Sequence, residues 1–169
     1  MYELKNVSFR YANTEEAGAI KNINLSIHSG EAVLICGESG CGKTTLLRLL
    51  NGLIPNYFEG TLEGQVLFDQ ADIRELDIRD MAERVGTVFQ NPKTQFFTLN
   101  TTSEIAFGCE NIGLQPEDIQ SRVERVIAEF KIEKLMNRSS FALSGGEKQK
   151  IACACISAME PDVFLLDEP

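Results

Sequence analysis

The nine-residue stretch from Gly37 to Thr45 constrains the fold of this 169-residue chain more than any other feature. It fits the spacing G-x-x-x-x-G-K-[ST], in which glycines let backbone N–H groups converge on an anion. The lysine adds a positive charge, the threonine hydroxyl suits Mg²⁺, and a helix starting here directs its positive end at the same point. The pattern predicts a phosphate-binding loop made of Gly37, Glu38, Ser39, Gly40, Cys41, Gly42, Lys43, Thr44 and Thr45.

The residues on either side of this loop predict the strand and the helix that such a loop requires. The apolar run 31–36 is expected to be a buried strand, and 46–50 a helix that Asn51-Gly52 ends. The alternative is a glycine-rich turn without a ligand. Because strand, loop and helix come in the required order, we expect a bound nucleotide.

Composition and charge limit the partners. The chain is 43% hydrophobic and 24% charged, as in globular proteins, and its net charge of −9 argues against a nucleic-acid partner and against binding to anionic lipid. No apolar run approaches the roughly 18 residues that span a bilayer, and the N-terminus does not resemble an export signal, so we expect no direct membrane insertion. The five cysteines show no C-x-x-C spacing and indicate a reducing compartment.

Hydrophobic patterning predicts the remaining elements. Strands are expected at 2–11, 20–28, 61–68 and 85–89. A short helix is expected at 77–83 with Asp77 as its cap, and helices and loops from about 91 to 140. One of these helices begins at Pro116, with Val123 and Val126 on its apolar stripe and a solvated face carrying Arg122, Glu124, Arg125 and Glu129. The only histidine, His28, is expected to be an exposed structural residue.

Three further positions are candidates for ligand binding. Tyr11 ends the first strand and either caps the sheet or stacks on a base. Ser144 and Glu147 have the spacing of a capping box, and the glycines between them leave N–H groups open to an anion. The run 163–166 predicts a buried strand that presents Asp167 and Glu168 at its carboxyl edge, where one acid holds Mg²⁺ and the other orients a water.

Together these segments resemble the ATP-binding subunit of ABC transporters. The resemblance is carried by 37–45, Gln90, 163–168 and the segment 143–147, whose LSGGE sequence is the family's own signature. It implies an α/β fold: a phosphate-loop (RecA-like) NTPase core with an N-terminal antiparallel β part and an inserted α-helical subdomain. The implied single domain, 1–169, has 1–90 and 160–169 in the core and 91–159 in the helical subdomain.

The resemblance also implies ATP and Mg²⁺ as ligands and assigns roles. Glu168 matches the catalytic base, and Gln90 the glutamine that senses Mg²⁺ and the attacking water. Thr44 and Asp167 match the other Mg²⁺ contacts. Two such subunits sandwich two nucleotides, as a homodimer or a heterodimer. The residues expected to contact nucleotide are Tyr11 on adenine, Gly37 to Thr45 on the phosphates, and Ser144, Gly145, Gly146 and Glu147 on the ATP of the partner.

The segments 88–97 and 104–111 narrow the resemblance to the energy-coupling factor and cobalt-type importer ATPases, which power the uptake of vitamins or of cobalt and nickel ions. This implies a transmembrane transporter component as partner and a peripheral place on the cytoplasmic face of the cell membrane. Phe96 and Phe97 are candidates for the contact with that partner, or else core aromatics. The alternatives are a soluble ABC-type ATPase without a transport role and a nucleotide-binding fragment without activity.

Two departures from the family pattern stand out. Lys148-Gln149-Lys150 follows the signature where the family more often has arginine. The family also continues past Glu168 with a segment that packs on the partner subunit and a histidine that contacts the γ-phosphate, and His28 lies in the wrong place to replace it. We therefore expect a chain truncated at its C-terminus, which alone binds nucleotide weakly and hydrolyses ATP poorly or not at all.

Overall fold

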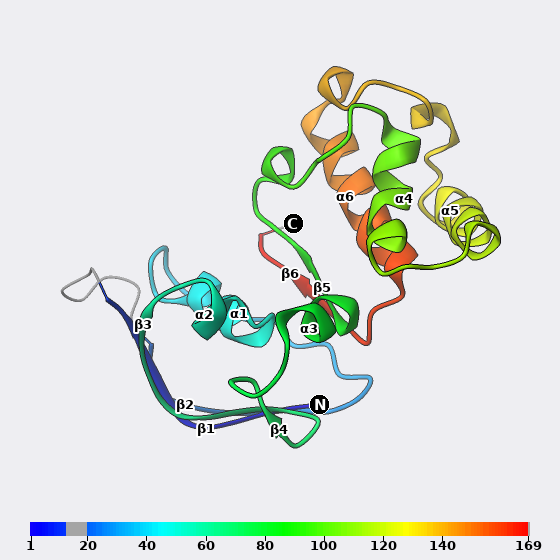
Figure 1. Cartoon of the computed structure of the whole chain (residues 1–169). Helices are drawn as coiled ribbons and strands as arrows, with labels where there is room; N and C mark the ends of the chain where they lie inside the picture. The colour runs from blue at the N-terminus through cyan, green and yellow to red at the C-terminus, as the bar shows by residue number, and fades with distance from the viewer. Residues whose placement is uncertain (13–19, 169) are drawn as a thin grey trace. The chain divides into compact units, whose positions relative to one another are not determined.

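The structure is a computed structural model of the chain and describes residues 1–12 and 20–168 (Figure 1). These residues form two compact units, Met1–Ala82 and Glu83–Pro169. Residues 13–19, between the first two predicted strands, lie outside the described residues. None of the described helices is both long and apolar enough to cross a membrane.

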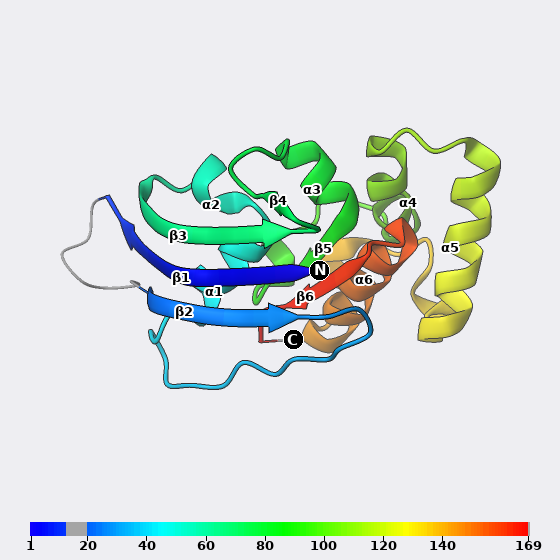
Figure 2. The ribbon, with the colours of Figure 1, turned by 90° about the horizontal axis from the view of Figure 1, so that it is seen from below.

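The first unit is built on a four-stranded antiparallel sheet in the order β2-β1-β3-β4. Its elements are β1 (Tyr2–Tyr11), β2 (Ile20–Ile27), α1 (Lys43–Leu50), α2 (Leu53–Asn56), β3 (Gly60–Phe68), β4 (Ala71–Asp72) and most of α3 (Ile78–Arg84), whose last two residues belong to the second unit. Figure 2 shows α1 and α2 behind this sheet, and the two views together place them on one of its faces. The predicted strands at 2–11, 20–28 and 61–68 and the helix capped by Asp77 are confirmed.

A bulge in β1 decides which of its residues reach the core. Leu4 and Val7 are both buried although they lie three positions apart, where strict alternation would place them on opposite faces. The register shifts between them, and Asn6 there has a φ of 49°. On the neighbouring strand Gly64 has a φ of 80°, and a Cβ atom on it would lie 2.5 Å from the carbonyl oxygen of Asn6. The bulge inserts an extra residue into β1, and this lets both Leu4 and Val7 face the core.

The run 31–36 before the phosphate loop is not a strand, so that prediction is wrong. Within the described residues it joins neither sheet, and the side chains of Val33 and Leu34 are 46% and 86% exposed. A strand is stable when a neighbour satisfies its backbone N–H and C=O groups and covers its side chains. The apolar pattern of the run does not reveal whether that neighbour exists.

The second unit combines a two-stranded parallel sheet with helices. Its elements are β5 (Val85–Val88), α4 (Thr101–Asn111), α5 (Pro116–Phe130), α6 (Gly145–Met159) and β6 (Val163–Leu166), with 3-10 turns at Pro92–Thr94, Glu133–Leu135 and Ser140–Ala142. All of β5 is buried, and α5 begins at Pro116, as predicted. The predicted burial of β6 is only half right, because Phe164 and Leu166 are 52% and 49% exposed. Successive side chains face opposite sides of a strand, and only one side of β6 is covered.

The helices of the second unit enclose a buried cluster to which α4, α5 and α6 all contribute. Val123 and Val126 of α5 face this cluster, as predicted. The opposite face of α5 is not simply solvated, which corrects the prediction for two of its residues. Arg122 and Arg125 form ion pairs of 2.9 and 2.8 Å with Glu160, just past the end of α6. The two arginines thereby fasten α5 to α6.

The division between the units falls after Ala82, whereas the sequence placed 1–90 and 160–169 together. Because β5 pairs with β6 and packs against α6, the contacts group β5 with the helices. The assignment of 160–169 to the core with 1–90 stays a prediction.

Candidate functional site

The phosphate loop has the backbone shape of an anion cradle. Gly40 and Gly42 have φ values of 81° and 101°, in the left-handed region that glycine enters without strain. The side chain of Lys43 folds back over the loop, and its Nζ atom donates to the carbonyl oxygens of Gly37 at 3.0 Å and Glu38 at 2.9 Å. The ammonium group is thus held at the loop, where it can offset the charge of a bound phosphate.

The ends of the loop are also suited to this shape. A Cβ atom on Gly37 would lie 2.6 Å from the Sγ atom of Cys41, so a side chain at position 37 would displace that thiol. The helix α1 begins at Lys43, and no side chain caps its start. The N–H groups of a first helical turn have no partner within the helix, which makes an uncapped start suited to an anion.

Tyr11 lies at the end of β1 within a small polar and aromatic cluster of the first unit. Its hydroxyl accepts a hydrogen bond from Nη1 of Arg48 at 2.9 Å and lies 3.3 Å from Oγ1 of Thr45. The guanidinium of Arg48 also lies 4.1 Å from the ring centroid of Phe58. Sequence reasoning missed Arg48 and Phe58. Arg48 lies in α1 and Phe58 in the segment before β3, and no local pattern in the sequence links either of them to Tyr11.

In the second unit, the register of the parallel strands brings two predicted site residues together. Val88 pairs with Leu166, so the residues that follow each strand lie side by side. Gln90 donates from Nε2 to Oε2 of Glu168 at 2.5 Å. Asp167 lies between, with its N–H bonded to the carbonyl of Val88 at 2.9 Å and its side chain buried.

This arrangement presents oxygen ligands of the kind that Mg²⁺ prefers. The amide nitrogen of Gln90 faces Glu168, which leaves the amide oxygen for a cation. The carboxylate of Asp167 is buried, whereas Glu168 is exposed and open to a water molecule. The donor set therefore fits a hard divalent ion beside a carboxylate that can position water.

The signature segment forms the start of α6. Ser144 is the N-cap and forms a complete capping box with Glu147, as the spacing predicts: Ser144 N donates to Oε2 of Glu147 at 2.7 Å, and Glu147 N donates back to the serine hydroxyl at 3.4 Å. The backbone N–H of Ser144 lowers the pKa of the Glu147 carboxyl, and Arg138 pairs with it at 3.3 Å. Gly145 and Gly146 have open space where a Cβ atom would lie. The helix start is thus accessible, and the anion site there remains a prediction.

Glu104 is a buried acid that sequence reasoning missed. Its side chain is 4% exposed, and its oxygens accept hydrogen bonds from the N–H groups of Phe97, at 3.1 Å to each oxygen, and of Thr98, at 2.6 Å. The only signal in the sequence is an acid in the first turn of a helix, which usually reflects the helix dipole alone. Here the carboxylate holds the loop that leads from Gln90 to α4.

Phe96 and Phe97 have different environments. Phe96 is half-buried and packs against the cluster of the helical unit, so it belongs to the core aromatics. Phe97 is 75% exposed and stacks on Phe107 with 5.1 Å between ring centroids. Leu99 and Phe141 are also large exposed apolar side chains, 70% and 78% accessible.

The loop that leads into α4 is hydrogen-bonded to the loop that leads into α6. Asn100 forms an isolated antiparallel bridge with Ser139. Ser140 donates from its N–H to the carbonyl of Leu99 at 2.9 Å and from its hydroxyl to the carbonyl of Thr98 at 3.1 Å. Residues before α4 and residues after α5 are therefore joined just before the signature segment.

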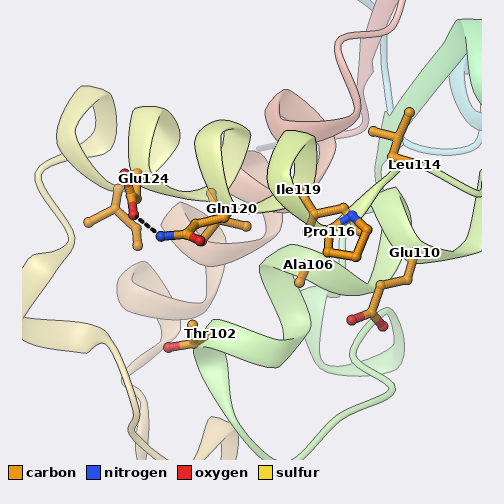
Figure 3. Close-up of a pocket in the computed structure, with 10 residues that line it drawn as sticks. Thr102, Ala106, Glu110, Leu114, Pro116, Ile119, Gln120 and Glu124 are labelled. Atoms are coloured by element: carbon orange, nitrogen blue, oxygen red, sulfur yellow. Dashed lines mark hydrogen bonds between the residues drawn. The ribbon is translucent and has the colours of Figure 1, made fainter.

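A groove of about 660 Å³ lies between α4 and α5 (Figure 3). Figure 3 shows Ala106, Pro116 and Ile119 gathered in it, with Glu110 at one end. The charged residues that line it, Glu110 and Glu124, are both acidic. None of the predicted site residues lines it, and its charge would repel a phosphate.

His28 has the exposed environment that the sequence predicted, and the cysteines differ in their exposure. His28 is exposed and pairs with Glu31 at 3.3 Å, so it is a surface residue. Cys153 and Cys155 are partly buried on α6, and burial raises the pKa of both thiols. Cys41 of the phosphate loop is exposed.

The family model described as ABC transporter matches residues 20–169. The chain is 53% identical over all 169 residues to an ABC transporter ATP-binding protein of Treponema denticola and covers 34% of that protein. It is 40% identical over 167 residues, 99% of its length, to a protein of the same description from Pyrococcus abyssi and covers 59% of it. The chain thus spans about a third of the length of the first of these curated relatives.

Two solved structures share this fold over almost the whole chain. The first is cbiO1 from Clostridium perfringens, described as part of the ABC transporter complex cbiONQ, with a TM-score of 0.84, 32% identity and coverage of 99% of this chain and 65% of that one. The second is the ATP-binding cassette MJ0796, a dimer in a post-hydrolysis state with ADP and Pi bound. Its TM-score is 0.81 at 29% identity, with coverage of 98% and 73%.

Proposed function

The chain belongs to the ABC transporter family, as its ATP-binding domain, and on that premise we propose that it binds and hydrolyses ATP with the residues described above. The expected α/β fold of that domain is confirmed by the two structural neighbours. The observation that carries the proposal is the 2.5 Å hydrogen bond between Gln90 and Glu168 at the ends of paired strands. It supports a shared role for this amide and this carboxylate in orienting one water molecule.

The roles follow from the chemistry of each group. The backbone N–H groups of the phosphate loop and Lys43 bind the phosphates, and Tyr11 stacks on the base. By the family resemblance, Thr44, Asp167 and Gln90 would hold Mg²⁺, which would offset the charge of the phosphate oxygens. Glu168 accepts a hydrogen bond from the attacking water and aligns it with the terminal phosphorus. Catalysis is then a matter of positioning and of preorganised charge.

The experiment is ATP hydrolysis and ATP binding measured on the same assembled protein, because the chain by itself is expected to hydrolyse ATP poorly or not at all. Replacing Glu168 by glutamine keeps the size of the side chain and removes its charge, so turnover should fall by about a hundredfold or more while ATP affinity stays within about threefold. The matched control is Glu83→Gln, an exposed acid in the last turn of α3, which should leave both quantities unchanged. Full turnover in Glu168→Gln would refute the assigned role.

We further propose that the protein works as one of two ATP-binding subunits on a transmembrane component, at the cytoplasmic face of the membrane. Ser144, Gly145, Gly146 and Glu147 would then contact the ATP of the partner subunit, which their open helix start supports. The similarity to cbiO1, part of an ABC transporter complex, supports an importer of the cobalt or energy-coupling factor type. Of the two phenylalanines after Gln90, the exposed one, Phe97, is the candidate contact with the membrane component.

Co-purification from detergent-solubilised membranes of the source cells separates the transport role from its alternative. Retention of a membrane protein that is weakened by Phe97→Ser, but not by Tyr57→Ser at another exposed aromatic, supports transport. A protein found wholly in the soluble fraction with its ATPase activity intact is a soluble ABC-type ATPase instead.

A further inference from the structure

We propose that Arg48 is a positioning residue for the nucleotide base, because it fixes the ring of Tyr11 on which the base stacks. The inference rests on the proposed function, in which ATP binds with its base on Tyr11. It adds a residue of α1 to base recognition, a role that the phosphate-loop pattern itself does not contain.

The hydroxyl of Tyr11 lies within hydrogen-bond distance of two side chains. A guanidinium can only donate, so the phenol oxygen accepts from Arg48 at 2.9 Å. The buried Oγ1 of Thr45 lies 3.3 Å from the phenol oxygen, and either hydroxyl can donate in this second hydrogen bond. Thr45 and Arg48 lie three positions apart, so they share one face of α1. The tip of the tyrosine is therefore held by two side chains of the same helix.

The guanidinium is itself fixed by an aromatic ring. It lies 4.1 Å from the centroid of Phe58, a distance at which the cation and the ring attract each other. The ring of Phe58 meets that of Tyr11 edge-on, with 6.0 Å between centroids. A lysine in place of Arg48 would keep a donor but lose the planar group that stacks and donates at once.

α1 carries residues proposed to serve both ends of the nucleotide, Lys43 for the phosphates and Arg48 for the base. Arg48 follows Lys43 by five residues, which is about 7.5 Å along a helix axis. The start of α1 faces the phosphates, whereas Arg48 holds the residue proposed to face the base. The spacing between phosphate binding and base binding is thus set within one rigid helix.

A purely structural role, in which Arg48 only fastens α1 to β1, predicts different binding behaviour. Loss of such a fastening would weaken the binding of any ligand of the phosphate loop. Loss of base positioning would weaken only ligands that carry a base. Inorganic triphosphate has the phosphates of ATP without the base, so a comparison of the two ligands separates the roles.

The experiment measures the Kd of the protein for ATP and for inorganic triphosphate in the parent, in Arg48→Met and in Arg48→Lys. Stacking on an aromatic ring contributes to the affinity for the base, so partial loss of it in Arg48→Met should raise the Kd for ATP about five- to tenfold. The Kd for triphosphate should stay within about twofold, and Arg48→Lys should fall between parent and Arg48→Met. The control is Arg79→Met, which removes an exposed arginine of the same unit.

Tyr11→Phe completes the test, because it removes the hydroxyl through which Arg48 acts. In that background Arg48→Met should raise the Kd for ATP no further, as expected for coupled residues. Should Arg48→Met fail to fold, Arg48→Lys and Tyr11→Phe carry the same comparison. An unchanged ATP affinity, or an equal loss of ATP and triphosphate affinity, would overturn the inference. A parent protein that binds triphosphate and not ATP, or neither ligand, would refute the proposed function and the inference with it.

Discussion

Replacing Glu104 by alanine should lower the free energy of unfolding by about 3 kcal/mol, because it removes the acceptor of two N–H groups. The carboxylate is 4% exposed, and it accepts from Phe97 N at 3.1 Å and from Thr98 N at 2.6 Å. A buried donor left without a partner costs about 1–3 kcal/mol, so the two together cost about 2–6 kcal/mol. Because Phe97 is largely exposed, water can reach part of this site, and we expect the lower half of that range.

Glu104→Gln should have a smaller effect. The amide keeps one oxygen for Thr98 N, but its NH₂ group replaces an oxygen that accepts from Phe97 N. We expect a loss of about 1 kcal/mol, since a neutral hydrogen bond replaces one to a charged group. The order of the two substitutions, alanine worse than glutamine, follows from the geometry alone.

Urea denaturation of the protein measures these losses, and amide hydrogen exchange locates them. Protection should fall first at the N–H groups of Phe97 and Thr98. The control is Glu110→Ala, an exposed acid on the same helix, which should change stability by less than about 0.5 kcal/mol. The reasoning is refuted if Glu104→Ala is no more destabilising than Glu110→Ala.

Two further predictions concern burial and packing. Burial raises the pKa of Cys155, so its thiol stays protonated at pH 8. Alkylation followed by mass spectrometry should therefore modify the exposed Cys41 well before Cys155. Equal alkylation rates of the two thiols would contradict the packing of α6. A Cβ atom on Gly86 would lie 2.2 Å from Cγ2 of Ile156, so Gly86→Ala should lower the free energy of unfolding by about 1–3 kcal/mol and with it the urea midpoint. Gly146→Ala should not lower the midpoint, because a Cβ atom at position 146 would lie in open space. A Gly86→Ala protein as stable as its parent would show that β5 and α6 are not closely packed.

Features that depend on a few neighbouring residues were predictable from the sequence. The capping box of Ser144 and Glu147 and the start of α5 at Pro116 need only the residues of one helical turn. The phosphate loop is likewise local, since its shape depends on glycines and on one lysine within nine residues. Register was not predicted, but once β5 and β6 pair, the side-by-side positions of Gln90 and Glu168 follow directly.

Features that depend on distant partners were missed or mispredicted. The run 31–36 looks like a buried strand, yet a strand depends on a neighbour that its own residues do not specify. Arg122 has the pattern of a solvated charge and instead meets Glu160 after a different helix. Arg48 gains its importance from a phenol 37 residues away, and Glu104 from the backbone N–H groups of a loop outside its own helix. Apolar periodicity carries no information about such polar contacts.

The hydrogen bonds between the loops before α4 and α6 have a consequence for how this protein can vary. Because Ser140 bonds to the carbonyls of Thr98 and Leu99, a substitution in one loop changes the surroundings of the other. Energetic effects of residues in contact are not additive, so the tolerated residues at 98–100 should depend on those at 139–141. Among relatives, the residues of these two loops should therefore change together, although about forty residues of chain separate them.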